Sequence, residues 1–424
     1  MADANYQYYF VLGANHSLSK VEIINVLLKK SVKFDILEAS EEILLIETAS
    51  RLEINSLISE LGGTIKIGQI FDKYSYENFP DNFLDAITGE EFKEFFLTLQ
   101  DSLHFGISVY NGGGKYKALN NLWFLAPKIT RIIKEKLGIK SIHLGERKIP
   151  SFLVDKTGFL TQGFELIIIS GHSHVYIGKT LVLQDYQSYS FRDYGRPDRD
   201  AKSGMIPPKV AKMMINFAHQ DKNQTFLDPF CGSGTILQEL VLLGYQNIIG
   251  TDLEARAIRS TQDNLDWLFK KYDLNRDKYK INIFKNDVRY LSTQLSANSI
   301  DAIVTEPYLG SPKAKYFSSH QLKVEVSRLA PLYVSAFTEF GKLVKKDGVV
   351  VITFPVFRFN NQFFNLEIRE KIHRLGFQAQ DFINPKLDSS HLLKLKITPR
   401  NSIVFFHPGQ TISREIIVFK KVNT

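Results

Sequence analysis

The 424-residue chain has 44% hydrophobic and 23% charged residues, the composition of a globular protein long enough for two or three domains. Its single cysteine excludes an intramolecular disulfide framework and a cysteine-built zinc site, so we expect a reducing, cytoplasmic setting. The net charge of +8 is compatible with a polyanionic partner, and no apolar run is long enough to predict a membrane-spanning helix.

The first part of the chain, residues 1–75, alternates strand and helix patterns. The expected strands and helices cover 8–12, 20–28, 34–38, 43–47, 53–61 and 64–71. This β-α-β-β-α-β order is that of a ferredoxin-like unit, and none of its residues is suited to catalysis. The polar stretch 72–90, which contains a proline, is interpreted as a linker.

The next part, residues 76–185, contains the densest basic region of the chain. Its patterns predict two helices and three strands, at 91–99, 104–110, 122–137, 165–170 and 174–181. A charge run is most often a solvated helix face, but basic side chains near a glycine turn also suit contacts with phosphates. On the second interpretation, the candidate RNA-binding residues are Lys115, Lys128, Arg131, Lys134, Arg147 and Lys148.

Residues 186–205 are polar, but aromatic and arginine side chains recur in them, so we do not expect a floppy linker. The segment is followed by Pro207 and Pro208, which suit the first turn of a helix. That helix is expected to bury one apolar face. The segment therefore comes directly before the glycine-rich turn described below, and it could fold over that turn.

From residue 226 the chain alternates strands and helices, which predicts a parallel α/β sheet covered on both faces. The expected strands are 226–228, 247–252, 281–284, 300–304 and 348–354. The end of the chain differs, because 401–406 and 415–419 flank a turn and predict an antiparallel hairpin.

The stretch 225–235 organises this sheet. A short strand ends on Asp228, glycines at 232 and 234 follow, and a helix begins at once. This arrangement brings backbone N–H groups and a helix N-terminus to a cofactor, and a Cβ at the glycines would obstruct it. We interpret the stretch as the cofactor loop of an S-adenosylmethionine-dependent methyltransferase.

Three further strand ends supply companion side chains, because ligands of a doubly wound sheet lie beyond the carboxyl ends of its strands. Asp252, about 20 residues after the glycine loop, suits two ribose hydroxyls, and Asp287 suits an adenine amine. Each acid alone could be a turn or capping residue, but the ordered set favours a cofactor site. The expected cofactor-binding residues are Ser203, Asp228, Pro229, Phe230, Gly232, Gly234, Thr235, Asp252, Leu253, Asp287 and Val288.

The fourth strand end, Thr305-Glu-Pro-Tyr308, carries the expected reaction site. Methylation of an exocyclic base amine requires acceptors that hold its N–H groups, so that the nitrogen lone pair can face the methyl group. Pro307 fixes a carbonyl, the side chain before it supplies a second acceptor, and Tyr308 can stack on a flipped-out base. We therefore predict Thr305, Glu306, Pro307 and Tyr308 as the catalytic residues.

We expect the cysteine and the histidines to be structural residues. Cys231 is expected to be a small filler beside the glycines, since nothing nearby in the sequence activates it, and this counts against a cysteine-dependent ring-carbon methyltransferase. The histidines are scattered and lack metal-ligand spacing, so we predict no metal site.

Taken together, the motifs resemble those of the THUMP-domain tRNA guanine-N2 methyltransferases, the group that modifies guanosine 10 in archaea and eukaryotes. The matching pieces lie at 176–180, 192–197, 203–209, 227–235, 250–252, 286–287 and 305–308. The first half of the chain also looks like the ferredoxin-like and THUMP pair of this family, so the resemblance covers nearly the whole chain. It implies S-adenosylmethionine bound around Asp228, Asp252 and Asp287, and a basic N-terminal platform that grips the acceptor end of tRNA. The implied domains are ferredoxin-like (1–75), THUMP-like (76–185) and class I methyltransferase (186–424).

One motif departs from the family pattern. The family usually has Asp-Pro-Pro-Tyr at the fourth strand end, where this chain has Thr305-Glu-Pro-Tyr308. Aligned on Pro-Tyr, Thr305 takes the place of the acid; aligned on the acid, Glu306 does. We prefer the first register because it keeps the carbonyl and the stacking ring, although a threonine hydroxyl is a weaker acceptor than a carboxylate.

Two other functions fit parts of the sequence. The same site residues would serve an amine methyltransferase acting on DNA or ribosomal RNA. The Thr305-Glu306 departure would also suit a catalytically weak RNA-binding protein that retains the methyltransferase fold. The first half of the chain favours structured RNA as the partner, most specifically tRNA, and leaves a small activating subunit open.

Overall fold

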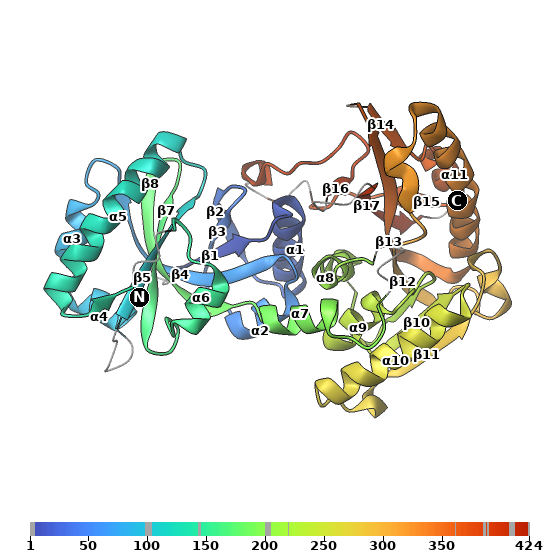
Figure 1. Cartoon of the computed structure of the whole chain (residues 1–424), viewed down its shortest axis with the longest axis horizontal. Helices are drawn as coiled ribbons and strands as arrows, with labels where there is room; N and C mark the ends of the chain where they lie inside the picture. Colours follow the sequence, from blue (N-terminus) through green and yellow to red (C-terminus); the bar gives the residue numbers. More distant parts are fainter. Residues whose placement is uncertain are drawn as a thin grey trace. The chain divides into compact units, whose positions relative to one another are not determined.

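The computed structural model describes residues 5–97, 104–142, 146–199, 205–218, 220–360, 362–384, 387, 390–406 and 412–422. The chain divides into two compact units, drawn in Figure 1. Unit 1 comprises residues 1–186 and 385–395, and unit 2 comprises residues 187–384 and 396–424. Within the described ranges, none of the helices combines the length and the apolarity that a membrane crossing needs.

Unit 1 is built on one eight-stranded sheet, whose order is β2-β3-β1-β4-β8-β7-β5-β6. Its first elements follow the predicted order: β1 (Tyr6–Leu12), α1 (His16–Lys29), β2 (Phe34–Ala39), β3 (Ile43–Thr48), α2 (Ile54–Glu60) and β4 (Thr64–Ser75). The others are α3 (Asp81–Ala86), α4 (Glu90–Phe96), β5 (His104–Asn111), α5 (Tyr116–Leu137), β6 (Lys140–Ser141), α6 (Ser151–Lys156), β7 (Gly163–Ser170) and β8 (His174–Leu183).

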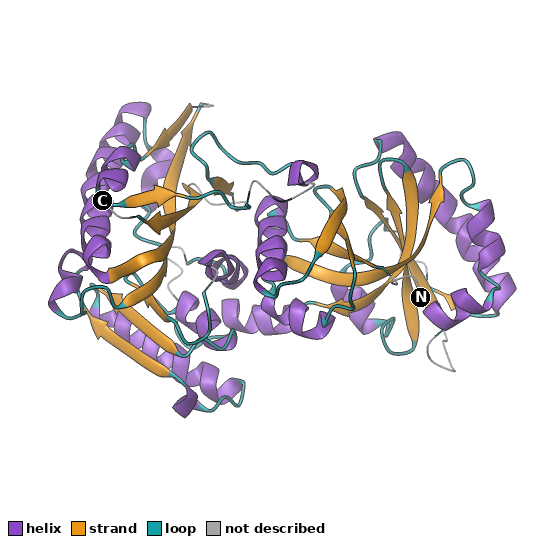
Figure 2. Cartoon of the chain, turned by 180° about the vertical axis from the view of Figure 1, so that it is seen from behind, coloured by secondary structure: helices purple, strands orange, loops and turns teal. Residues whose placement is uncertain are grey.

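Strands β4 and β8 join the two predicted N-terminal domains into a single sheet, which Figure 2 shows in orange. They pair antiparallel from Lys66 opposite Leu183 to Ser75 opposite His174. Lys66 of β4 also donates two hydrogen bonds, of 2.7 and 3.0 Å, to the fully buried carboxylate of Glu165 on β7. The predicted boundary at residue 75 therefore falls inside a continuous sheet, and the division into 1–75 and 76–185 stays a prediction.

The stretch interpreted as a linker, 72–90, is structured, so that interpretation is wrong. β4 continues to Ser75, and α3 follows. The rings of Phe79 and Phe83 stack with their centroids 5.9 Å apart and pack into a buried cluster with Tyr74. The polar residues and the proline of this stretch favoured a linker, but its aromatic side chains are buried in this cluster and hold the stretch in place.

A late segment of the chain belongs to unit 1. The short helix η4 (Ser390–Leu393) lies against β2, and the buried ammonium group of Lys20 on α1 donates to the carbonyl of Leu393. Next to it, Lys394 Nζ lies 3.4 Å from His172 Nε2. The predicted domain 186–424 thus contributes residues 385–395 to the N-terminal unit, which the sequence did not indicate.

Unit 2 contains a nine-stranded sheet with the path β11-β10-β9-β12-β13-β17-β15. Its strands are β9 (Thr225–Asp228), β10 (Asn247–Asp252), β11 (Lys280–Lys285), β12 (Ile300–Thr305), β13 (Val344–Phe359), β14 (Gln362–Asn365), β15 (Phe377–Ala379), β16 (Ile403–Phe405) and β17 (Ile412–Lys421). The strands from β11 to β13 run parallel, as predicted. The predicted antiparallel hairpin is formed by β16 and β17.

The helices of unit 2 cover both faces of this sheet, and Figure 1 shows α8 and α11 on opposite sides of it. They are α7 (Tyr186–Tyr194), α8 (Pro208–Ala218), α9 (Thr235–Leu242), α10 (Ala255–Lys271), α11 (Ser319–Leu343) and α12 (Arg369–Arg374). Short 3-10 turns, η1 (Arg276–Lys278), η2 (Val288–Thr293) and η3 (Pro312–Tyr316), lie between them. The α/β sheet predicted for this half is therefore present.

The packing of α11 fixes the end of β12, where the reaction site is expected. All residues of β12 are buried, and the aromatic residues Tyr333, Phe337 and Phe340 of α11 pack into the same apolar cluster as its isoleucines. The helix begins at a capping box, in which Ser318 and Gln321 satisfy each other's backbone N–H groups. The strand end is thus held by a long helix with a defined start.

Candidate active site

A cavity of about 620 Å³ opens at the carboxyl ends of β9, β10, β11 and β12. Its volume is typical of small-molecule and cofactor sites. Most of the predicted cofactor-binding residues line it: Asp228, Pro229, Phe230, Gly232, Thr235, Asp252, Leu253, Asp287 and Val288. Glu306, Pro307 and Tyr308 line it as well. Gly234 is not part of the lining, and Ser203 lies outside the described residues.

The turn between β9 and α9 forms one wall of the cavity. Gly232 and Gly234 have φ angles of +54° and +80°, in the left-handed region that favours glycine. A Cβ at Gly234 would also come within 3.0 Å of the Thr261 side chain on α10. The N–H of Gly232 donates to Asp252 Oδ2 at 3.0 Å, so the turn is fixed to the end of β10.

Asp228 lies at the floor of the cavity and is 2% exposed. It accepts hydrogen bonds from the Thr305 hydroxyl at 2.6 Å and from the Phe230 N–H at 3.2 Å. Burial raises the pKa of Asp228 to about 7, and the nearby carboxylates of Asp252 and Glu306 act in the same direction. The hydrogen bonds from Thr305 and Phe230 partly oppose this shift.

Thr305, which the preferred register puts in the place of the family's acid, does not face the cavity. Its side chain is fully buried, and its hydroxyl is occupied by Asp228. Glu306, the next residue, lines the cavity instead, because successive side chains of an extended segment point to opposite sides. The register in which Thr305 offers an acceptor to the substrate therefore does not match the geometry of this strand end.

Asp252 and Asp287 each combine a cavity-lining position with a local structural role. Asp252 accepts from the N–H groups of Gly232 and Glu254, and burial raises its pKa. Asp287 caps η2 by accepting from the Arg289 N–H at 3.0 Å, and its side-chain pairing with Arg289 lowers its pKa. Asp287 is thus both a capping residue, which was the alternative interpretation, and a residue that lines the cavity, as predicted.

A residue of α11 fixes the loop after β12. The hydroxyl of Tyr333, which is fully buried, donates to the backbone carbonyl of Tyr308 at 3.1 Å. Its ring stacks on Phe354 of β13, with a centroid separation of 5.2 Å. Tyr308 is 47% exposed and lines the cavity, while its backbone carbonyl is held by this hydrogen bond.

An arginine that the sequence did not indicate lies behind this wall and holds Glu306. Arg414 of β17 donates from Nε and Nη2 to the two oxygens of Glu306, with the Nη2 bond at 2.8 Å. The side chains are 3% and 10% exposed, so this is a buried ion pair. No local pattern could have found it, because the residues are 108 positions apart and meet only through the β13–β17 pairing.

Described residues of the segment before α8 also line the cavity, in agreement with the position of that segment directly before the glycine turn. Asp198, Met205 and Ile206 line the cavity. Arg196 is buried, and it donates to the Thr235 hydroxyl at 2.7 Å. The nearby Arg192 forms a buried ion pair with Glu239 of α9. These arginines therefore brace the helix that follows the glycine turn.

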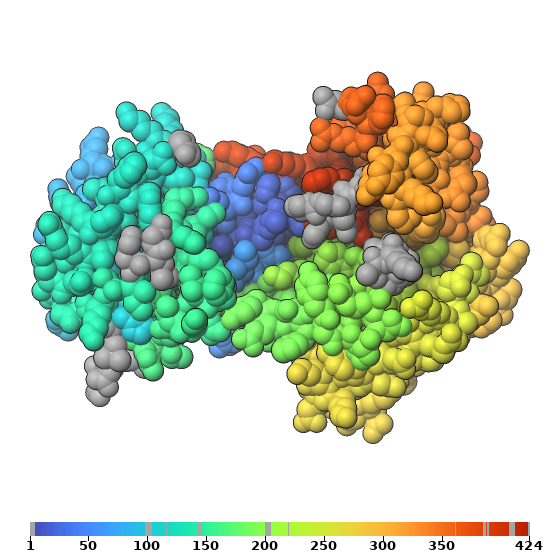
Figure 3. Space-filling view, viewed as in Figure 1, coloured from blue at the N-terminus to red at the C-terminus, as the bar shows by residue number. Residues whose placement is uncertain are grey.

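The six basic residues predicted to bind RNA are in unit 1. On α5, Lys128, Arg131 and Lys134 are exposed, and so is Phe124, one helical turn before Lys128. Part of this helix (turquoise) is visible on the surface in Figure 3. Lys115, directly before α5, is exposed as well. The helix thus presents a face that combines positive charge with an aromatic ring.

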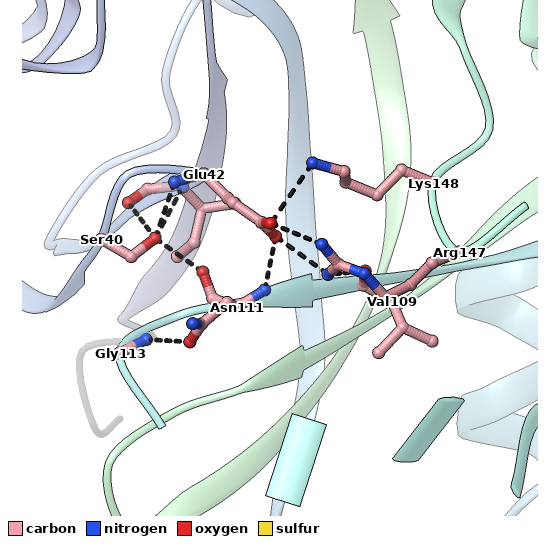
Figure 4. Close-up of polar contacts among 8 residues, drawn as sticks. Ser40, Glu42, Val109, Asn111, Gly113, Arg147 and Lys148 are labelled. Atoms are coloured by element: carbon pink, nitrogen blue, oxygen red, sulfur yellow. Dashed lines mark hydrogen bonds and ion pairs between the residues drawn. The ribbon is translucent and has the colours of Figure 1, made fainter. Parts of the chain in front are cut away.

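Arg147 and Lys148 differ from the others, because both pair with Glu42 (Figure 4). The Arg147 guanidinium contacts both Glu42 oxygens and donates to the Val109 carbonyl at 2.9 Å. The Asn111 N–H donates to the same carboxylate at 2.8 Å. Arg147 is therefore largely engaged in joining Glu42, the residue before β3, to β5, and it has less freedom to contact a phosphate.

Comparison with known families identifies a domain within unit 2. Residues 196–356 match the family model described as the RMKL-like methyltransferase domain. This span contains all of the predicted cofactor-binding and catalytic residues. Residues 108–263 also match a model described as a DNA methylase.

Curated relatives match a part of the chain. The tRNA (guanine(10)-N2)-dimethyltransferase of Methanocaldococcus jannaschii is 31% identical over 155 residues, which is 36% of this chain and 38% of that protein. The enzyme of the same name from Methanothermobacter thermautotrophicus is 33% identical over 107 residues, 25% of this chain and 28% of that protein. The chain thus spans less than two fifths of the length of these two relatives.

Solved structures extend the likeness of fold to the whole chain. TrmN from Thermus thermophilus has a TM-score of 0.55 at 14% identity, covering 99% of this chain and 100% of that one. The structure of SMU.472 complexed with SAH has a TM-score of 0.51 at 10% identity, with 99% and 98% coverage. These likenesses confirm the predicted fold class.

Proposed function

We propose that this chain, which carries an S-adenosylmethionine-dependent methyltransferase domain in residues 196–356, methylates an exocyclic amine of an RNA base, most specifically N2 of guanine in tRNA. One observation carries the proposal: residues suited to a nucleoside-bearing cofactor and a loop suited to a base amine line the same cavity. The names of the curated relatives support the choice of guanine N2 and of tRNA.

The cavity fits S-adenosylmethionine by its size and its donor set. Asp252 reaches it from the end of β10, where a carboxylate can accept from ribose hydroxyls. Asp287 reaches it from the end of β11, where it would accept from an adenine amine. The left-handed turn at Gly232 leaves the backbone of the β9–α9 turn free of a Cβ that would face the cofactor.

The cofactor, when bound, supplies a methyl group on a positively charged sulfur atom. The residues of the chain would orient the acceptor base toward it. Tyr308 would stack on the base, and the oxygens of Glu306 and of the Pro307 backbone would accept from its amine. The amine nitrogen held by these oxygens would accept the methyl group from sulfur and lose one proton to water. Such a reaction needs mainly alignment of the reacting atoms.

Unit 1 would supply most of the affinity for RNA. The exposed face of α5, with Lys128, Arg131, Lys134 and Phe124, suits contacts with phosphates and with an unstacked base. A tRNA partner and the THUMP-like nature of residues 76–185 are part of this proposal. The cytoplasmic location predicted from the single cysteine stays a prediction.

A methyl-transfer competition tests this function. Purified full-length protein, labelled S-adenosylmethionine and equal amounts of unmodified tRNA, ribosomal RNA and duplex DNA are incubated together. We expect the label in tRNA, and its loss in the Asp252→Ala variant but not in Asp263→Ala, an exposed acid of α10. Label in ribosomal RNA alone, or in no nucleic acid despite cofactor binding, would contradict the proposal.

DNA is the second candidate substrate, because residues 108–263 match a model described as a DNA methylase. The same acceptors at the end of β12 would hold an adenine or cytosine amine. Label found in the DNA of the competition experiment would favour this alternative.

A further inference from the structure

The pair formed by Glu306 and Arg414 is an unusual feature for the wall of a cavity. Glu306 follows the buried strand β12, and Arg414 lies on β17 opposite Pro355 of β13. Both side chains are nearly buried, and two hydrogen bonds join them. The pair therefore connects the end of β12 with β17, which lies two strands away in the sheet, and fixes a carboxylate at the cavity.

Stability does not explain the pair. Removing two charges from water costs several kcal/mol, and a buried ion pair is often no more stabilising than apolar residues of the same size. The carboxylate of Glu306 also repels that of the buried Asp228, so the pair adds a further unfavourable charge to this site. Arg414 is itself fixed, since Nη2 lies 3.5 Å from the carbonyl of Met205 on another wall. A fixed carboxylate at this point suggests a role toward the substrate.

The chemistry of the bases indicates which substrate a carboxylate would accept. The Watson–Crick edge of guanine presents two adjacent donors, N1–H and the N2 amine. In adenine and cytosine, the amine stands beside a ring nitrogen that is an acceptor. A carboxylate has two oxygens with about four lone-pair sites, of which Arg414 uses two. The remaining sites match guanine, and they would face an unfavourable ring nitrogen in adenine or cytosine.

We infer that Glu306 selects guanine by accepting from N1–H and N2–H together, and that Arg414 is a positioning residue that orients this carboxylate. The inference rests on the proposed function, because it concerns the base bound in the same cavity. It assigns Thr305 to a different task, the hydrogen bond to Asp228 below the cavity floor. The acceptor that reads the base is therefore Glu306, and not Thr305, which the preferred sequence register had placed in that role.

The test uses 2-aminopurine, which keeps the amine of guanine but has an acceptor at N1 in place of the N1–H donor. The guanosine that the wild-type protein methylates in a tRNA transcript is mapped first. It is then replaced by 2-aminopurine in a second transcript, and kcat/KM for methyl transfer is measured on both. Wild-type protein should strongly prefer guanosine. Glu306→Gln, which can donate to N1, should reduce the preference by roughly 10- to 100-fold.

Arg414→Lys tests the positioning role, because it keeps the positive charge and loses the two-pronged contact. It should also reduce the preference for guanosine, while the affinity for S-adenosylmethionine stays within about 3-fold of wild type and shows that the fold is intact. Arg400→Lys is the matched control, since Arg400 pairs with Glu415 of the same strand β17, which does not line the cavity, whereas the partner of Arg414 does. It should leave the preference unchanged.

Three results would overturn the inference. Equal loss of activity on both transcripts in Glu306→Gln would show that the pair is only a structural brace. An unchanged preference in that variant would show that another group reads the base. If the wild-type protein methylates adenine or cytosine and no guanine, the proposed function fails together with the inference, and this outcome is recognised at the mapping step.

Discussion

The hydroxyl of Thr305 donates a 2.6 Å hydrogen bond to the carboxylate of Asp228, which joins the ends of β12 and β9 beneath the cavity. Both side chains are buried, and the pKa of Asp228 is about 7 because burial disfavours its charged form. This contact links the reaction loop to the cofactor turn, and its protonation state has a measurable consequence for stability.

We predict that Asp228 makes the protein less stable as the pH rises from about 4 to 7. In this window the unfolded state has lost the proton that the folded state keeps, so the free energy of unfolding falls with pH, by up to about 4 kcal/mol in total. Asp228→Asn removes the titration. Chemical denaturation gives the free energy of unfolding of the variant minus that of wild type. This difference should be more positive at pH 8 than at pH 4.5. A difference independent of pH would contradict the raised pKa.

Asp252 is predicted to bind the cofactor without contributing to RNA binding. Asp252→Ala should raise the dissociation constant for S-adenosylmethionine by about 10- to 100-fold, because hydrogen bonds to a carboxylate contribute about 1.5–3 kcal/mol. Calorimetry with the cofactor and filter binding with tRNA provide the two readouts. Asp263→Ala, on the exposed side of α10, should change neither. Parallel losses of cofactor and RNA binding would mean that Asp252 supports the fold instead.

The Lys66–Glu165 pair is predicted to make the two halves of unit 1 unfold together. Glu165→Ala leaves the buried Lys66 ammonium without its counter-ion and should lower the free energy of unfolding by about 3–5 kcal/mol. The control is Glu60→Gln, which breaks the more exposed pair with Lys30 and should cost about 0–1 kcal/mol. Hydrogen exchange should show lost protection in both β1 and β5. Loss confined to one of these strands would indicate two independent domains.

The exposed face of α5 is predicted to contact phosphates. Replacing Lys128 and Lys134 by glutamate should weaken tRNA binding and reduce the slope of log Kobs against log salt by about 1 to 2. Lys136 is a poorer choice, since its ammonium donates to the Leu84 carbonyl at 2.6 Å. Lys33→Glu, on an exposed loop of the same unit, is the control. An unchanged slope in the double variant would remove α5 from the RNA-binding surface.

Much of the fold followed from local patterns. β10 was predicted with the bounds that it has, and the four strand ends were recognised because parallel strands gather their carboxyl ends at one edge. The orientation of Thr305 could also have been deduced. It is the last residue of a buried strand, so its side chain and that of Glu306 must point to opposite sides.

Other features depend on contacts between distant parts of the chain. Arg414 reaches Glu306 only because β17 adds antiparallel to β13, and no periodicity reports such a pairing. The docking of Leu393 onto Lys20 likewise joins residues 373 positions apart. The continuous sheet of unit 1 was missed for the same reason, since the register between β4 and β8 is set by tertiary packing.

The most direct test of the account is the identity of the methylated nucleoside. Unmodified tRNA transcripts are incubated with the full-length protein and S-adenosylmethionine that carries a deuterated methyl group, then digested and analysed by mass spectrometry. We predict the labelled methyl on N2 of guanosine, and its loss in Asp252→Ala. Label on adenosine or cytidine, or on a ring nitrogen of guanosine, would contradict the account.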